Sequence, residues 1–202
     1  MEFIFGIAVL IFSVIIHEVS HGLMALRLGD ETAKNLGRLT LNPIPHLDPI
    51  GSIILPALLY VTGSPILLGW AKPVPYNPYF LRDQKYGHLK VAIVGPLSNL
   101  ALAFIFGLFI RFGGVFGLLT PNLVEMLGFV VLINAVLFVF NMLPIPPLDG
   151  SKVLAAFLPP HYAMRMERIG LEGVFIVLIF LFLFPGLIFN TAIFIAELFA
   201  GL

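Results

Sequence analysis

The sequence predicts an all-α membrane protein that forms one domain over residues 1–202, and two observations lead to this fold class. The first is composition: 59% of the 202 residues are hydrophobic, 11% are charged, and the mean hydropathy is +1.05. A soluble domain is about half apolar and about a quarter charged. The second is a set of four stretches that are apolar and long enough to cross a bilayer. They lie at about residues 3–28, 89–112, 123–143 and 171–199.

A fifth apolar stretch, at about residues 50–68, is interrupted by Pro56, Gly63 and Pro65. It either crosses the membrane or dips into it and returns. If it does not cross, ten of the eleven basic residues lie on one side of the membrane, and Arg111 lies alone on the other. If it crosses, the split becomes seven against four. Because basic loops favour the cytoplasmic side, the first arrangement is favoured. We therefore expect four spans, both termini outside, and a re-entrant region at about residues 36–76.

Two segments that flank this fifth stretch alternate polar and apolar residues, as short strands do. Residues 37–42 end before Pro43, and residues 69–75 contain two prolines, which are typical of sheet edges. Non-helical backbone at membrane depth is tolerated only where protein surrounds it or where it lines a wet cavity. We therefore expect a short re-entrant segment of mixed β and helical character between the first two spans.

The first apolar stretch contains the motif His17-Glu18-Val19-Ser20-His21. Ionisable side chains at membrane depth are costly, and they therefore mark candidate functional sites. On a helix, His17 and His21 share one face, and Glu18 lies beside them. In zinc proteases with this spacing, the imidazoles bind the metal and the glutamate handles the proton of the attacking water. The alternative is a pair of histidines that are hydrogen-bonded inside a helix bundle.

Catalytic zinc takes a third protein ligand. The candidates are Asp48, Asp149, His46, His88 and His161. Asp149 is favoured because Pro144, Pro146 and Pro147 cannot continue the preceding helix, so that polar groups become available at a membrane boundary. The carboxylate of Asp149 can then turn back towards the metal. The alternative is an ordinary turn, since Asp followed by Gly150 is a common turn pair.

Two further motifs accompany the histidine motif, and together the three resemble the site-2 protease family of intramembrane zinc metalloproteases. The segment Asn141-Met142-Leu143-Pro144-Ile145-Pro146-Pro147-Leu148-Asp149-Gly150 matches the family pattern Asn-x-x-Pro-x-Pro-x-Leu-Asp-Gly at every fixed position. The segment Gly95-Pro96-Leu97-Ser98-Asn99 resembles the family's Gly-Pro-x-x-Asn. The resemblance covers a three-span catalytic core. Many members also carry a PDZ or a CBS domain, for which this chain has no room, so we expect a minimal form.

The resemblance implies His17, His21 and Asp149 as ligands of Zn²⁺ and Glu18 as the catalytic acid/base. It also implies an active site that opens towards the cytosol, in agreement with the charge count. We expect the protein to reside in a prokaryotic cell membrane as a multi-pass protein.

Polar residues inside the spans are candidates for substrate binding. Asn99 and Asn141 either hold an extended substrate backbone, which the resemblance supports, or join helices by hydrogen bonds. The predicted strand at residues 37–42 offers an edge onto which an unwound substrate could add, with Leu39 and Leu41 in contact with it. His46 and Asp48 either lie near the metal or cap a turn.

The sequence therefore predicts a zinc endopeptidase that cleaves transmembrane segments of other membrane proteins. Its expected partners are such substrates and the lipid bilayer. The formal net charge of zero gives no reason to expect nucleic-acid binding. One alternative is a catalytically silent scaffold or metal-binding protein on the same fold. A transporter is the other alternative, although the paired repeats with broken helices that are usual in transporters are not found in the sequence.

Overall fold

The computed structural model describes residues 2–54, 58, 61, 71–114, 117 and 119–201. Three of its helices are long and apolar enough to cross a membrane: α1 (Glu2–Arg27), α4 (Gly87–Gly113) and α5 (Pro121–Asn141). They correspond to the first three predicted spans. Within the described residues the chain is helical and contains no strand, so the predicted all-α membrane fold is confirmed.

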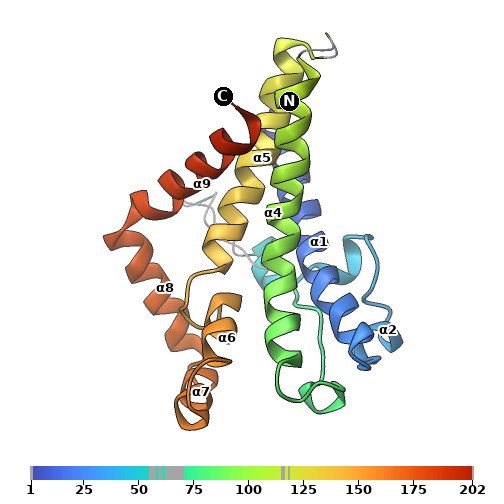
Figure 1. The fold of residues 1–202 in the computed structure, drawn as a ribbon, viewed down its shortest axis with the longest axis vertical. Helices are drawn as coiled ribbons and strands as arrows, with labels where there is room; N and C mark the ends of the chain where they lie inside the picture. Colours follow the sequence, from blue (N-terminus) through green and yellow to red (C-terminus); the bar gives the residue numbers. More distant parts are fainter. Residues whose placement is uncertain are drawn as a thin grey trace.

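Helix α4 lies at the centre of the bundle and packs against α1, α5 and α9 (Pro185–Ala200), as Figure 1 shows. Small residues permit these close approaches, as is usual between membrane helices. A Cβ at Gly107 of α4 would lie 2.6 Å from the Cβ of Phe199. The adjoining core is formed by residues from three helices, namely Ala103, Ile110, Val131 and Ala200. This packing holds α4, α5 and α9 together.

The fourth predicted span, at residues 171–199, consists of two helices rather than one. α8 (Leu171–Leu183) and α9 are bent by 75° at the break between them. The break falls at Phe184, whose φ of −128° and ψ of 53° are not helical, and α9 begins at Pro185. Proline has no N–H with which to continue the hydrogen bonding of the preceding turn. Together the two helices make either one broken span or a re-entrant pair.

The two chain ends lie at the same end of the molecule, which is the upper end of Figure 1. The opposite end carries three short helices, namely α2 (Thr32–Asn35), α6 (Asp149–Ala155) and α7 (Pro160–Glu167). Helix α6 packs against α4. The loop that follows α5 therefore returns the chain to the central helix.

The predicted strand at residues 37–42 is wrong. These residues form a turn and bends, and they lead into a short 3-10 helix, η1 (Ile44–His46), and a π-helix, η2 (Pro49–Ile54). Local bonds replace a strand ladder: the Asn42 N–H donates to the hydroxyl of Thr40, and the Ile44 N–H donates to the side-chain oxygen of Asn42. Such short polar side chains favour turns over extended pairing.

The second predicted strand, at residues 69–75, is also absent as far as the chain is described. Residues 71–77 form no regular structure and lead into the 3-10 helix η3 (Pro78–Phe80). Residues 69 and 70 lie outside the described residues, as does most of the stretch at 50–68. The prediction that this stretch is re-entrant therefore stays a prediction.

Candidate metal centre

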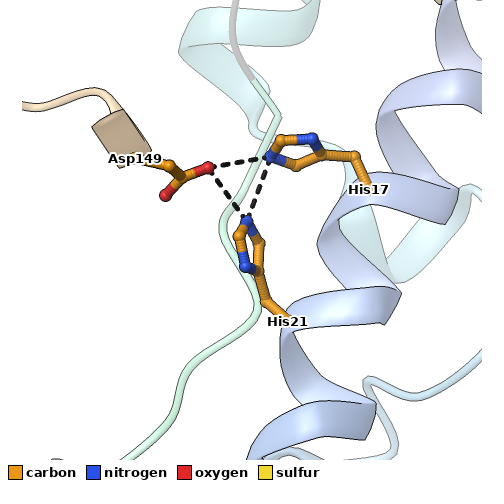
Figure 2. Close-up of side chains that lie close together, drawn as sticks. All are labelled: His17, His21 and Asp149. Atoms are coloured by element: carbon orange, nitrogen blue, oxygen red, sulfur yellow. Dashed lines mark hydrogen bonds and ion pairs between the residues drawn. The ribbon is translucent and has the colours of Figure 1, made fainter. Parts of the chain in front are cut away.

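Three side chains from two helices meet inside the molecule, as Figure 2 shows. His17 and His21 project from α1, and Asp149 is the first residue of α6. The Nε2 atoms of the histidines lie 3.0 Å apart, and they lie 3.0 Å and 3.1 Å from Asp149 Oδ2. All three residues are buried. Among the described residues, this is the group of histidine and acidic side chains that could hold a metal ion.

The second ring nitrogen of each histidine shows how the rings are protonated. His17 Nδ1 lies 2.7 Å from the side-chain oxygen of Asn99, and His21 Nδ1 lies 2.6 Å from the carbonyl oxygen of Val91. Because both partners can only accept, each Nδ1 carries the proton. In the neutral rings, both Nε2 atoms then present lone pairs to each other and to a carboxylate oxygen. Such a cluster needs a positive charge at its centre.

Zinc fits this set of donors in chemistry and in size. Neutral imidazole and carboxylate are ordinary ligands of zinc in catalytic sites. Tetrahedral zinc with bonds of about 2.0 Å separates its ligand atoms by about 3.3 Å. The observed separations of 3.0–3.1 Å are close to that value. The three residues therefore have the arrangement of a three-ligand metal site.

The chain reaches the site through a sharp return after α5. The helix ends at Asn141, and α6 begins eight residues later at Asp149. A Cβ at Gly150 would overlap the carbonyl groups of Met142 and Leu143, so only glycine allows the two segments to approach this closely. The prolines predicted to end the helix lie in this return.

Lys152 holds the second oxygen of the carboxylate, since its Nζ donates to Asp149 Oδ1 at 2.9 Å. Burial raises the pKa of Asp149, but the charge of the Lys152 ammonium is among the contacts that lower it below its usual range. The carboxylate is therefore ionised, and Oδ2 remains directed at the histidines.

Gly95 of α4 lies directly against the metal centre. A Cβ at this position would lie 2.8 Å from His17 Nε2 and closer still to His21 Nε2. No other residue fits between α4 and the two imidazoles. The Gly-Pro-x-x-Asn motif contains this glycine, but the sequence alone assigned it no role.

A buried polar network continues from His17 into the bundle. The Asn99 amide group donates to the carbonyl of Ser13 at 3.2 Å and to the side-chain oxygen of Asn134 at 3.0 Å. Asn134 in turn donates to the Ser13 hydroxyl at 2.9 Å. Asn99 and Asn134 are completely buried. Sequence reasoning missed Ser13, although it lies one helical turn before His17 on the same face.

Glu18 is half-buried and belongs to a different set of contacts. Its Oε2 accepts a hydrogen bond of 2.8 Å from the Val74 N–H. Val74 lies in the irregular segment that follows the apolar stretch at 50–68, far from α1 in sequence. No sequence pattern indicates this contact.

The other predicted substrate-binding residues lie apart from the metal ligands. The Asn141 side chain donates to the Leu137 carbonyl of its own helix at 3.0 Å. Leu39 is half-buried against Gly22 of α1, and Leu41 is 56% exposed. Asn99 is engaged with His17 rather than free for a substrate. Their roles in substrate binding stay predictions.

Of the five candidates for the third ligand, the structure brings Asp149 to the two histidines. The other four make different contacts. His46 Nε2 donates to the Thr40 carbonyl. The Asp48 carboxylate accepts hydrogen bonds from the N–H groups of Ile50 and Gly51. Both side chains therefore stabilise the loop in which they lie. His88 shares a hydrogen bond of 2.8 Å with the Tyr76 hydroxyl, and the ring of His161 lies against Tyr162.

Comparison with known proteins agrees with this geometry. The profile of peptidase family M50 matches residues 111–184. The Bacillus subtilis protein named "Putative zinc metalloprotease YwhC" is 40% identical over 181 residues, covering 87% of this chain and 78% of the relative. "Putative zinc metalloprotease Rip2" of Mycolicibacterium smegmatis is 31% identical over 180 residues, covering 89% of this chain and 67% of the relative. No solved structure matches the chain significantly.

These similarities include a relative that shares two fifths of its residues with this chain over most of both sequences. The name of that relative specifies a zinc metalloprotease, and the two histidines and the aspartate described above could hold Zn²⁺. The chain also has three apolar helices that are long enough to span a bilayer. It belongs to peptidase family M50, the site-2 protease family, and is an integral membrane zinc metalloprotease.

Proposed function

We propose that the protein is an intramembrane endopeptidase that hydrolyses peptide bonds in or near transmembrane segments of other membrane proteins, as in regulated intramembrane proteolysis. The proposal rests on the buried cluster of His17, His21 and Asp149. The two histidines of this cluster lie on α1, an apolar helix that is long enough to span a bilayer. Ionisable groups inside a membrane are costly, so they are kept there for a function. A metal site on a membrane-spanning helix therefore favours a substrate that also lies in the membrane over a soluble one.

The roles of the residues follow from their contacts. His17, His21 and Asp149 hold the metal, and Asn99 and Val91 fix the orientation of the two rings. Zinc bound there supplies a Lewis acid that polarises the scissile carbonyl and makes water more acidic. Glu18 accepts a proton from the attacking water and passes it to the leaving amine. One carboxylate oxygen of Glu18 is held by Val74, so the other serves the proton transfer.

We further propose that the site opens towards the cytosol of a prokaryotic cell. The charge count supports this orientation, with ten of the eleven basic residues expected on that side. Lys152 lies in α6 and Arg165 in α7, and both helices lie at the end of the molecule away from the termini (Figure 1). Water then reaches the metal from the nearer surface without crossing the bilayer.

The proposal is tested by co-expressing a tagged test substrate that contains one transmembrane segment. Wild-type protein is compared with Glu18→Gln, and Glu125→Gln serves as the control because Glu125 is an exposed glutamate on α5. We expect wild type and Glu125→Gln to cleave the substrate and Glu18→Gln to lose at least about a hundredfold in rate. Equal cleavage by wild type and Glu18→Gln would instead favour a scaffold or metal-binding protein on this fold.

A further inference from the structure

The segment 71–77, which we name the strap, lies against α1 and is tied to the rest of the fold by its backbone. Three of its N–H groups donate to groups outside the segment. Lys72 N–H donates to the His46 carbonyl at 2.8 Å, Val74 N–H donates to Glu18 at 2.8 Å, and Asn77 N–H donates to Asp30 Oδ2 at 2.6 Å. Pro73 and Pro75 have no N–H, so Val74 is the single donor between them.

A buried charged side chain anchors each end of the strap. Arg38 is 7% exposed, and its Nη2 donates to the carbonyls of Lys72 at 2.8 Å and Pro73 at 3.3 Å. Asp30 is 1% exposed and also accepts the Thr32 N–H at 2.9 Å through Oδ1. Burying a charge is costly unless hydrogen bonds compensate for it. Both charges are thus used to hold backbone in place.

Side-chain packing also fixes the position of the strap along α1. Val74 is buried at 5% exposure, while the two residues that precede it, Lys72 and Pro73, are exposed. A Cβ at Gly22 would lie 2.7 Å from Val74 Cγ1 and 2.5 Å from Leu39 Cδ2. Gly22 lies one helical turn after Glu18 on the same face. The Val74 side chain therefore fills the space over Gly22 while its N–H meets the carboxylate.

We propose that the strap is a positioning device for Glu18, in which the Val74 N–H fixes one carboxylate oxygen and Arg38 fixes the strap. The inference rests on the proposed function, in which Glu18 carries the proton. A free carboxylate on a flexible side chain samples many rotamers, whereas one held by a backbone donor keeps its second oxygen in a single place. The hydrogen bonds of the Arg38 side chain go to the strap and not to Glu18 or the candidate metal ligands, so Arg38 acts through the strap.

The first test compares two substitutions at Val74. Val74→Pro removes the N–H, and the preference of residues before proline for extended backbone makes a proline acceptable there. Val74→Ala keeps the N–H and loses side-chain packing. Loss of a hydrogen bond to a charged group predicts a fall in kcat of about 10- to 100-fold for Val74→Pro, with KM and bound zinc unchanged. For Val74→Ala we expect a fall of at most about threefold.

Arg38 supplies an independent test that does not alter the strap itself. Arg38→Leu should lower kcat by about tenfold with KM and zinc content unchanged, and Arg38→Lys should restore part of the loss. Arg38→Leu combined with Val74→Pro should be no slower than Val74→Pro alone, because both act through one hydrogen bond. If Val74→Pro fails to fold, the Arg38 pair decides, with loss of kcat rescued by lysine as the supporting result.

Two results would overturn the proposal. One is an equal kcat for Val74→Pro and Val74→Ala, and the other is an Arg38→Leu enzyme that matches wild type in kcat. Failure of the proposed function has a different signature, since wild type and Glu18→Gln would then cleave equally. A Glu18→Gln enzyme that is inactive beside a fully active Val74→Pro enzyme would reject the strap proposal alone.

Discussion

At the residue scale, Gly95 is where the metal centre leaves the least space. A Cβ there would lie within 2.8 Å of His17 Nε2 and nearer to His21 Nε2. We predict that Gly95→Ala weakens zinc binding at least about tenfold, because the imidazoles must move away from the metal position. Metal content after dialysis against a zinc buffer measures this. Gly128→Ala on α5 is the control, since a Cβ at that position meets nothing within 4 Å. Equal zinc content in both variants would refute the prediction.

Asn99 is the second residue whose role can be separated by measurement. Asn99→Ala leaves His17 Nδ1, the Ser13 carbonyl and Asn134 without their buried partner. Removal of a partner that orients a metal ligand costs about 10- to 100-fold in metal affinity. We expect that loss in a competitive chelator titration, while Asn190→Ala, at an exposed position on α9, stays at the wild-type value. Full affinity in Asn99→Ala would leave substrate binding as the better account of this residue.

The candidate residues of the metal centre, which the structure brings together, were predictable from local spacing and from one motif. His17, Glu18 and His21 lie within two turns of one helix, and Asp149 stands in a recognisable motif. The partners that orient them could not be predicted in the same way. Any residue type supplies a backbone carbonyl like that of Val91, and any residue except proline supplies an N–H like that of Val74, so no sequence pattern marks these two groups. Their positions depend on how α4 and the strap pack against α1.

At the element scale, the start of α4 depends on Asp83. Its carboxylate accepts the N–H groups of Lys85 and Tyr86, and Lys90 Nζ donates to it at 2.6 Å. The bond from Lys90, together with the backbone bonds, lowers the pKa of Asp83 below its ordinary value of 3.8. Because the folded-state pKa is the lower one, the stabilisation is complete above pH 3.8 and is lost as the pH falls through the folded-state pKa.

Substitution of Asp83 should therefore have a pH-dependent effect. We predict that Asp83→Asn lowers the thermal unfolding temperature in detergent at neutral pH and that the difference from wild type shrinks below about pH 4. Thermal scans of both proteins across pH 3–7 test this. A difference that is constant across that range would show that the charge of Asp83 is not the cause.

The elements themselves were predictable where hydrophobicity alone decides them. The first three spans agree with α1, α4 and α5 because long apolar helices are the favoured way to satisfy backbone groups in lipid. Two short strands were predicted, at 37–42 and 69–75, and neither is present in the described part of those segments. The alternation of polar and apolar residues at 37–42 favours a strand, but the side chains of Thr40 and Asn42 accept hydrogen bonds from nearby backbone N–H groups and favour turns. The turns are the structure that forms. The bend between α8 and α9 lies just before Pro185 and is explained by that proline. Hydropathy does not show it, because one proline hardly changes the mean hydropathy of a long apolar stretch.

At the scale of the whole molecule, the topology is open to direct measurement, because the chain has no cysteine to remove. Tyr79→Cys introduces a thiol at an 87% exposed position before α4, and Asn122→Cys introduces one at the start of α5. We expect an impermeant reagent to label Asn122→Cys in intact cells and Tyr79→Cys only after permeabilisation. Labelling of Tyr79→Cys from outside would reverse the proposed orientation of the site.

We propose that the protein cleaves a peptide bond of a membrane-spanning segment and that His17, His21 and Asp149 are the residues that would hold zinc. The most direct measurement uses purified protein in proteoliposomes with a single-span substrate, and mass spectrometry locates the cut. Removal of zinc should abolish cleavage, one equivalent of zinc should restore it, and the cut should fall in or beside the span. Asp149→Asn should stay inactive at the same zinc concentration. Cleavage that persists without zinc, or a cut far from the span, would contradict the account.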